Sequence, residues 1–147
     1  MPDADVSRFV EAQRTEFDPA LREIEAGRKR SHWIWYVFPQ IVGLGSSPMA
    51  ERYAITSAAE ASAFLDHPML GANYRRIVTA VGEQVRAGNS LGRLLGRPDD
   101  AKVVSSLTLF SGVADPDDPL RATADEILRL DGRSPCAATR SFLLDAG

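Results

Sequence analysis

At four candidate helix starts an acidic or hydroxyl side chain directly precedes proline: Asp18-Pro19, Ser47-Pro48, Asp118-Pro119 and Ser134-Pro135. The side-chain oxygen of such a residue accepts a hydrogen bond from an unpaired N–H in the first turn of a helix. Proline at the first helical position costs little, because its missing N–H would have no partner there. Together with a capping box at Ser57-x-x-Glu60, this recurrence predicts a chain built from many helices.

Apolar residues repeat with helical spacing behind these starts. The longest stripe falls at i, i+4, i+7, i+8, i+11 and i+15, with Leu70, Tyr74, Ile77, Val78, Val81 and Val85. Similar patterns occupy residues 103–110 and 120–128, and two further helices are expected near the N-terminus, the second starting at Asp18. Alternating strand patterns are scarce. We therefore expect an all-α fold, a compact single-domain bundle of about six or seven helices over residues 1–147.

The composition is that of an ordinary globular protein. The chain has 147 residues, 44% of them hydrophobic and 25% charged, which predicts one domain. One cysteine, Cys136, cannot form an internal disulfide and fits a reducing compartment. The acidic N-terminus resembles no secretory signal, and no apolar run approaches the ~20 residues of a membrane helix. We expect a cytoplasmic protein with no membrane partner. A net charge of −3 argues against binding to duplex nucleic acid.

The stretch GRKRSHWIWYVFPQIVGLGSS, residues 27–47, is unlike the rest of the chain. Its first half has a structural interpretation, in which a helix ends at Ala26 and Gly27 is the left-handed residue after it. The cations that follow would then lie beside the negative end of the helix dipole. The functional interpretation is that charge and rings face an anionic ligand, because guanidinium groups pair with phosphate and aromatic rings stack on bases. Its candidate residues are Arg28, Lys29, Arg30, His32, Trp33 and Trp35.

The apolar segment 33–38 is buried in either conformation that its length allows. A run this short cannot be assigned by periodicity alone, and Pro39 limits it because the residue before a proline avoids the helical region. We favour a short central helix, with a buried strand as the alternative. Both tryptophans are expected to be mostly buried, since they lie within this run.

The second half of the stretch contains a glycine-rich loop before a helix start. It lacks the Gly-Lys-Ser/Thr of a phosphate-binding Walker loop and the third glycine of a dinucleotide fingerprint. Glycines nevertheless let the backbone approach a ligand, and the free N–H groups of a helix start can bind an anion. The alternative is a tight turn with an ordinary N-cap. The candidate residues here are Gln40, Gly43, Gly45, Ser46 and Ser47.

The segment DDAKVVSSLTLF, residues 99–110, adds a lysine and hydroxyls on one helix. Asp99 is predicted as its N-cap, with Lys102 and Ser105 at i and i+3 of one face. These side chains could face the same anion as Arg28 and Lys29, although hydroxyls on a packed helix usually bond to the i−4 carbonyl. A Ser-Lys nucleophile would lack an orienting partner, so no catalytic residue is assigned.

No metal site or reactive thiol is predicted. The two histidines, His32 and His67, have no cysteine or carboxylate at ligand spacing. Cys136 follows Ser134-Pro135 at an expected helix N-terminus, which would lower its pKa. Without a second cysteine or a placed histidine, we interpret it as a packing residue.

The order of these blocks resembles a known family. The stretch 27–47, RFVEAQ at 8–13, RYAI at 52–55 and DDAKVVSSLTLF at 99–110 resemble the DUF1810 family over nearly the whole chain. This is a bacterial family of unknown function, and the resemblance implies a mainly α-helical single domain with no established activity. Some members carry the label calpastatin, but the chain has no repeated inhibitory segment. It departs from the family near its C-terminus, where GRSPCAATRSFL lacks the usual aspartate.

These observations favour a domain that binds an anionic, phosphorylated or nucleotide-like small molecule, without a cofactor or metal. The site would combine residues 27–47 with the helix that carries Lys102 and Ser105. The alternative is an interaction module that binds an acidic protein or single-stranded nucleic acid through its basic-aromatic segment. Buried tryptophans beneath a concave basic surface would support the first hypothesis, and protruding tryptophans on a flat face would support the second. The patterns assign no reaction and no oligomeric state.

Overall fold

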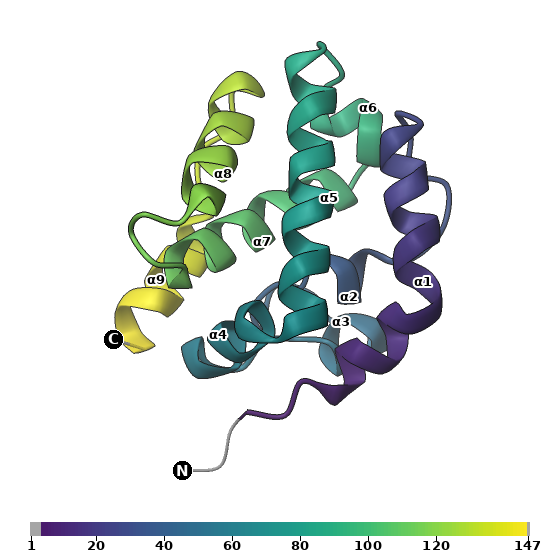
Figure 1. Ribbon diagram of the computed structural model, residues 1–147. Helices are drawn as coiled ribbons and strands as arrows, with labels where there is room; N and C mark the ends of the chain where they lie inside the picture. Colours follow the sequence, from purple (N-terminus) through teal and green to yellow (C-terminus); the bar gives the residue numbers. More distant parts are fainter. Residues whose placement is uncertain (1–3, 147) are drawn as a thin grey trace.

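The computed structural model describes residues 4–146, and within that range the chain forms nine helices and no extended strand (Figure 1). In chain order they are α1 (Ser7–Glu25), α2 (Ile34–Val37), α3 (Pro48–Arg52), α4 (Ala58–Asp66), α5 (Pro68–Arg86), α6 (Leu91–Leu95), α7 (Asp99–Val113), α8 (Pro119–Leu130) and α9 (Ala137–Ala146). The all-α prediction is confirmed. The number of helices exceeds the expected six or seven, and α6, with five residues, is too short to show a period in the sequence.

The bundle is arranged around α5. Figure 1 shows α1 and α8 on either side of this helix, and α4 packs against it as well. α7 passes behind α5 in that view and contacts α4, α6, α8 and α9. The end of α1 lies beside α6, which brings the turn after α1 close to the segment before α7. None of the helices in the described range has the length and apolar character needed to cross a bilayer.

Aromatic side chains fill the centre of the core. The predicted stripe of α5 is buried throughout, from Leu70 to Val85. Its Tyr74 lies 4.7 Å from the Phe110 ring and 5.7 Å from the Phe38 ring, measured between centroids. The Tyr74 hydroxyl reaches the Ser106 hydroxyl at 3.0 Å, so its polar end has a partner inside the core. This cluster joins α5 to α7 and to the end of α2.

Three of the predicted helix starts are confirmed by their hydrogen bonds. The side chains of Ser47, Ser57 and Asp118 accept backbone N–H groups at 3.1, 3.0 and 2.9 Å at the starts of α3, α4 and α8. The prediction for Ser134 is wrong, because α9 begins at Ala137 and residue 136 directly precedes it. The Cys136 N–H donates to the Thr108 hydroxyl at 3.0 Å, which holds this part of the connection against α7 and delays the helix.

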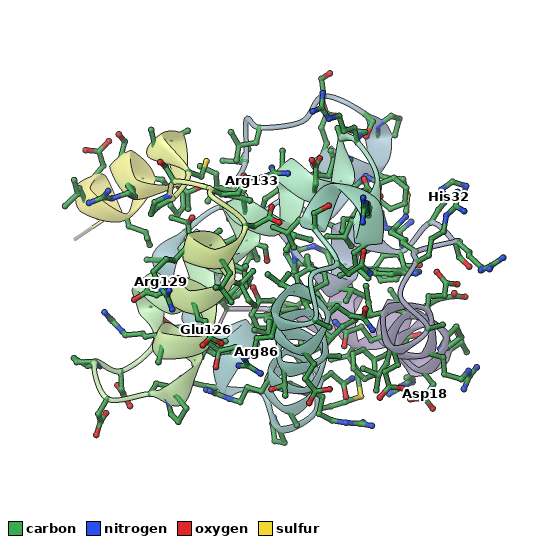
Figure 2. All side chains as sticks on the ribbon, turned by 90° about the horizontal axis from the view of Figure 1, so that it is seen from above. Asp18, His32, Arg86, Glu126, Arg129 and Arg133 are labelled. Carbon is green, nitrogen blue, oxygen red and sulfur yellow. The ribbon has the colours of Figure 1, made fainter. Side chains whose placement is uncertain are left out.

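The N-terminal segment forms one helix where two were expected. α1 continues through Pro19, and Asp18 is an exposed residue on its outer face instead of a cap (Figure 2). Proline in a helix interior removes one hydrogen bond and crowds the preceding turn. Here one apolar face runs across the proline, with Phe9, Phe17 and Ile24 all buried, and its packing against α5 outweighs the local cost.

The contact between α4 and α5 predicts that one methyl group added at Gly71 strongly destabilises the fold. A Cβ atom at Gly71 would lie 2.1 Å from the Leu65 carbonyl oxygen, and backbone atoms cannot move aside as a flexible side chain can. We expect Gly71→Ala to lower the free energy of unfolding by at least about 2 kcal/mol. Gly82→Ala in the same helix is the matched control, because its Cβ would meet no atom closer than 3.6 Å.

Alanine forms helices better than glycine, so Gly82→Ala should leave the free energy of unfolding unchanged or raise it by up to about 1 kcal/mol. Urea unfolding followed by circular dichroism measures both variants. Equal stabilities for the two variants would show that α4 and α5 are not in this close contact.

Candidate functional site

The basic segment begins in a turn that ends α1. Gly27 has φ +92° and is the expected left-handed residue after the helix. Its N–H donates to the Ile24 carbonyl at 2.9 Å, and the Arg28 N–H donates to the Glu23 carbonyl at 3.1 Å. The next N–H, that of Lys29, donates to the Leu94 carbonyl of α6 at 2.7 Å. The turn is therefore fixed both to its own helix and to α6.

The Glu23 side chain organises the residues after this turn. Its carboxylate accepts the backbone N–H groups of Arg30 and Ser31 at 2.7 and 2.9 Å, the Ser31 hydroxyl, and the Trp33 indole N–H at 2.9 Å. Partial burial raises the pKa of Glu23, but these hydrogen bonds lower it by more, to about 2. Residues 28–33 are consequently irregular, and the helix begins only at Ile34.

A partly buried carboxylate lies between the two lysines of the predicted site. Asp99 Oδ2 is 2.8 Å from Lys29 Nζ, and Asp99 Oδ1 is 3.6 Å from Lys102 Nζ. The Lys29 side chain is only 7% exposed, and its ammonium group also donates to the Ser31 carbonyl. The predicted N-cap role of Asp99 is wrong. Asp99 is the first residue of α7, and its carboxylate pairs with the two lysines instead of accepting a backbone N–H group of the first helical turn.

The two tryptophans occupy different environments. Trp33 is completely buried, whereas Trp35 is partly buried, and each ring has a lysine ammonium above it, Lys29 at 5.1 Å and Lys102 at 5.5 Å. The expected short helix at residues 33–38 is confirmed as α2, at Ile34–Val37. Trp35 lines a small hollow with Gln40 and Lys102, and its buried indole N–H has no hydrogen-bond partner among the described residues.

A larger hollow lies between the turn after α1 and α6. It has a volume of about 560 Å³, and we call it the basic hollow, lined by Gly27, Arg28, Lys29, Gly92, Arg93, Leu95 and Gly96. Three of these residues are glycines, and none is acidic. Arg28 and Arg93 are exposed and form no ion pair within the described residues, whereas Lys29 is neutralised by Asp99.

The other predicted site residues are spread around this region. His32 is exposed and lies at the periphery of the molecule (Figure 2), and Arg30 is exposed as well. Gly43, Ser46 and Ser47 form an exposed loop before α3, while Gly45 faces Gln40 and Ala50. Ser105 donates to the Ala101 carbonyl at 3.1 Å, the back-bond that its helical position predicts. The structure thus brings Lys29 and Lys102 to Asp99, and Trp35 and Gln40 share a hollow with Lys102. The exposed loop residues and His32 are not part of this arrangement.

Several residues of this region were missed by the sequence reasoning. Glu23 precedes the basic stretch and was not among the predicted site residues. The segment GRLLGRP at 92–98, which supplies the second side of the basic hollow through Gly92, Arg93, Leu95 and Gly96, repeats the Gly-Arg pair of the turn at 27–28. That repetition was a usable signal, but the segment is too short to show periodicity. Within residues 4–146 no group of histidine, cysteine and carboxylate side chains is suited to hold a metal ion.

The fold and this region define an all-α protein whose basic turn is fixed by Glu23 and Asp99. The chain belongs to the DUF1810 family, described as proteins of unknown function, whose family model matches residues 3–141. Among solved structures, the chain is similar to the conserved hypothetical protein Rv1873 from Mycobacterium tuberculosis. The two share 38% sequence identity over 95% of this chain and 96% of that one, with a TM-score of 0.86. A comparison with curated proteins finds no match.

The hydrogen bonds of Glu23 predict a pH-dependent contribution to stability. Because folding lowers its pKa from 4.5 to about 2, the carboxylate stabilises the folded state above pH 4.5. That contribution is lost as the pH falls toward 2. We expect Glu23→Gln to lower the free energy of unfolding by about 1–2 kcal/mol at pH 7.

The difference in the free energy of unfolding between Glu23→Gln and the wild type should shrink steadily between pH 5 and pH 2. Thermal unfolding at several pH values measures it. Glu25→Gln, the control, removes the same charge from an exposed residue of α1 whose carboxylate forms no ion pair within residues 4–146. A difference that stays constant with pH would show that the Glu23 charge does not stabilise the fold.

Proposed function

We propose that this protein binds an anionic, phosphate-bearing small molecule in the basic hollow. The supporting observation is that Arg28 and Arg93 face this hollow without an acidic partner among the described residues. The two carboxylates at the start of α7 are already paired, Asp99 with Lys29 and Asp100 with Arg133, each at 2.8 Å. Two guanidinium groups are suited to a phosphate, because each can donate two parallel hydrogen bonds to its oxygens.

The glycines of the hollow support the same ligand class. Gly27, Gly92 and Gly96 present backbone without side chains, so a ligand can approach the main chain closely. A volume of about 560 Å³ lies within the range of small-molecule sites. Leu95 is the one apolar side chain of the lining, so the ligand is recognised mainly through its charge. A phosphate, pyrophosphate or nucleotide phosphate chain fits this chemistry.

The buried lysine has a supporting role in this proposal. Lys29 is already paired with Asp99, and its backbone N–H is bonded to α6. It therefore fixes the position of the turn, and the exposed arginine beside it provides the charge that meets the ligand. Removing Lys29 would leave Asp99 without its closer partner inside the protein, and loss of binding would then be confused with loss of stability.

The burial of the tryptophans favours this proposal over an interaction module. An interaction surface places large aromatic side chains where a partner can cover them. Trp33 is completely buried and Trp35 is partly covered. Single-stranded nucleic acid would need such rings exposed for stacking, which Trp33 cannot provide.

We expect the protein to be stabilised by phosphate ligands through its two hollow-lining arginines. Pyrophosphate and ATP should raise the melting temperature relative to sodium chloride at equal ionic strength, because a ligand of the folded state alone stabilises it. The double variant Arg28→Ala, Arg93→Ala should lose most of this shift. Thermal unfolding and isothermal titration calorimetry measure the two effects.

The matched control is Arg30→Ala, Arg97→Ala, which removes the same charge from exposed arginines that do not line the hollow. It should keep the ligand-dependent shift. If both double variants lose the shift equally, the effect is general charge attraction. If the wild type responds to none of these phosphates, the proposal is wrong.

A further inference from the structure

A second hollow lies between α7, α8 and α9, and it shares no lining residue with the basic hollow. Its volume is about 430 Å³, which is within the range of small-molecule sites. We call it the α9 hollow, and its lining includes Ser111, Arg121, Asp125, Leu128, Arg140 and Leu144. Unlike the basic hollow, it combines side chains of both charges with several apolar side chains.

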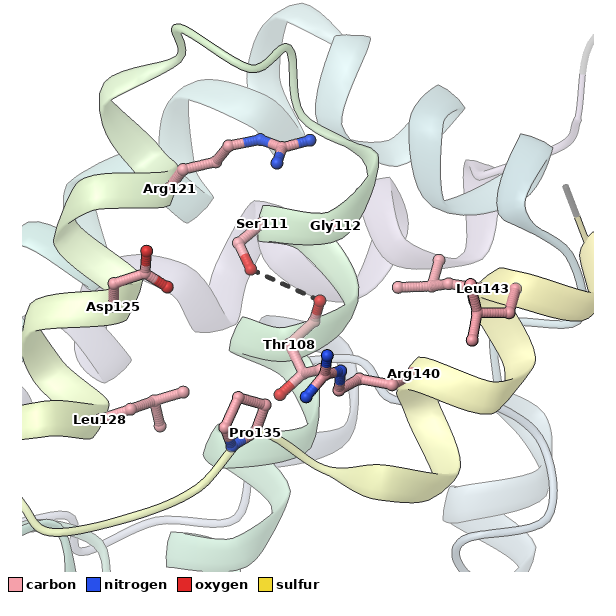
Figure 3. Close-up of a pocket in the computed structure, with 10 residues that line it drawn as sticks. Thr108, Ser111, Gly112, Arg121, Asp125, Leu128, Pro135, Arg140 and Leu143 are labelled. Carbon is pink, nitrogen blue, oxygen red and sulfur yellow. Dashed lines mark hydrogen bonds between the residues drawn. The ribbon is translucent and has the colours of Figure 1, made fainter.

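Two opposite charges in the α9 hollow have no partner within the described part of the chain. The Asp125 carboxylate on α8 and the Arg140 guanidinium on α9 are exposed, and neither forms an ion pair or a side-chain hydrogen bond with any of residues 4–146. Figure 3 shows the two side chains extending into the hollow from different sides, with Thr108 and Ser111 of α7 between them. Because the two charges are held apart, one cavity offers both an anionic and a cationic position.

A second arginine adds positive charge in a fixed direction. The Arg121 guanidinium donates from Nε and Nη2 to the Ala114 carbonyl at the end of α7, at 3.1 and 2.7 Å. Its Nη1 group has no hydrogen-bond partner among the described residues. The Ser111 hydroxyl donates to the Thr108 carbonyl at 3.4 Å, so its own oxygen can still accept a hydrogen bond. The hollow therefore offers guanidinium donors for a carboxylate, and a carboxylate and a hydroxyl as acceptors for an ammonium group.

Apolar side chains form the remainder of the lining. Leu128 is a buried residue of α8, whereas Leu144 of α9 is 81% exposed. Leu143 lies directly against α7, since a Cβ atom at Gly112 would be only 2.5 Å from its Cδ1 atom. An apolar group bound in the hollow would cover Leu144, and the removal of apolar surface from water is favourable.

We propose that the α9 hollow binds a small apolar zwitterion, namely an apolar amino acid or a short peptide of such residues. The ligand's carboxylate meets Arg140 and Arg121, its ammonium group meets Asp125, and its apolar side chain lies on Leu128 and Leu144. A plain acid would leave Asp125 unpaired beside a second negative charge, and a plain amine would leave the arginines without an anion. Only a ligand that carries both charges satisfies both positions. This site is separate from the phosphate site proposed above.

The first test uses the wild-type protein with matched ligands. Isothermal titration calorimetry should detect binding of L-leucine or leucylleucine, and the tighter of the two shows whether both charges are recognised on one residue or on two. N-acetylation removes the ligand's ammonium group, and C-terminal amidation removes its carboxylate. Each modified ligand should bind about 10-fold more weakly, because hydrogen bonds between charged groups are stronger than those between neutral groups. Glycine and glycylglycine, which lack the apolar side chains, should also bind more weakly.

The second test assigns each charge of the ligand to one residue of the protein. In Asp125→Asn the unmodified ligand should bind no better than its N-acetyl form, and in Arg140→Gln it should bind no better than its amide. Arg129→Gln changes an exposed residue of α8 that does not line the α9 hollow, so it is the control and should keep both preferences. Circular dichroism checks that each variant is folded.

The wild-type comparison remains decisive even if a variant does not fold. No binding of L-leucine or leucylleucine at concentrations up to about 10 mM would overturn the proposal. Equal binding of the acetylated, amidated and unmodified forms would overturn it as well, because the ligand's charges would then not be recognised. Preferences that survive in Asp125→Asn and Arg140→Gln would show that the ligand binds outside the α9 hollow, and the proposal would be wrong.

Discussion

One carboxylate determines how the chain passes from α1 into the core. Glu23 ties the end of α1 to the backbone of residues 30–31 and to the indole of Trp33. Trp33 is the largest completely buried side chain, and its ring packs near that of Phe38. The position of α2, and through it the aromatic cluster around Tyr74, therefore depends on hydrogen bonds to a residue of the preceding helix.

Features that depend on neighbours in the chain could be predicted from the sequence. The caps at Ser47 and Asp118, the left-handed Gly27 and the stripe of α5 are all local patterns. Asp99 was assigned as a cap for the same reason, yet its carboxylate binds Lys29, which is distant in the sequence. A cap contributes about 1 kcal/mol, and a buried charge left without a partner costs several times more. Local sequence patterns carry no information about the cost of leaving such a charge without a partner.

The candidate site was predictable in part. The basic stretch drew attention to the right turn, but consecutive residues of an irregular turn can point in opposite directions. Lys29 is directed inward to Asp99, while Arg28 is exposed in the basic hollow. The second side of that hollow comes from α6, whose five residues have no detectable period. Such a juxtaposition is a property of the packed bundle, and only the fold reveals it.

The separation of charge in this molecule has a kinetic consequence. The chain carries a net charge of −3, so an anion far away meets a weakly repulsive field. Within a Debye length of ~8 Å at physiological salt, however, it meets Arg28 and Arg93 at the α1–α6 end, which form no ion pair with any residue that the structure describes. Encounter of an anion with that end of the molecule is therefore favoured over what the net charge alone would give. Added salt screens the field of these arginines, so an anion that binds at the proposed site would associate more slowly at high salt even if its bound contacts were the same.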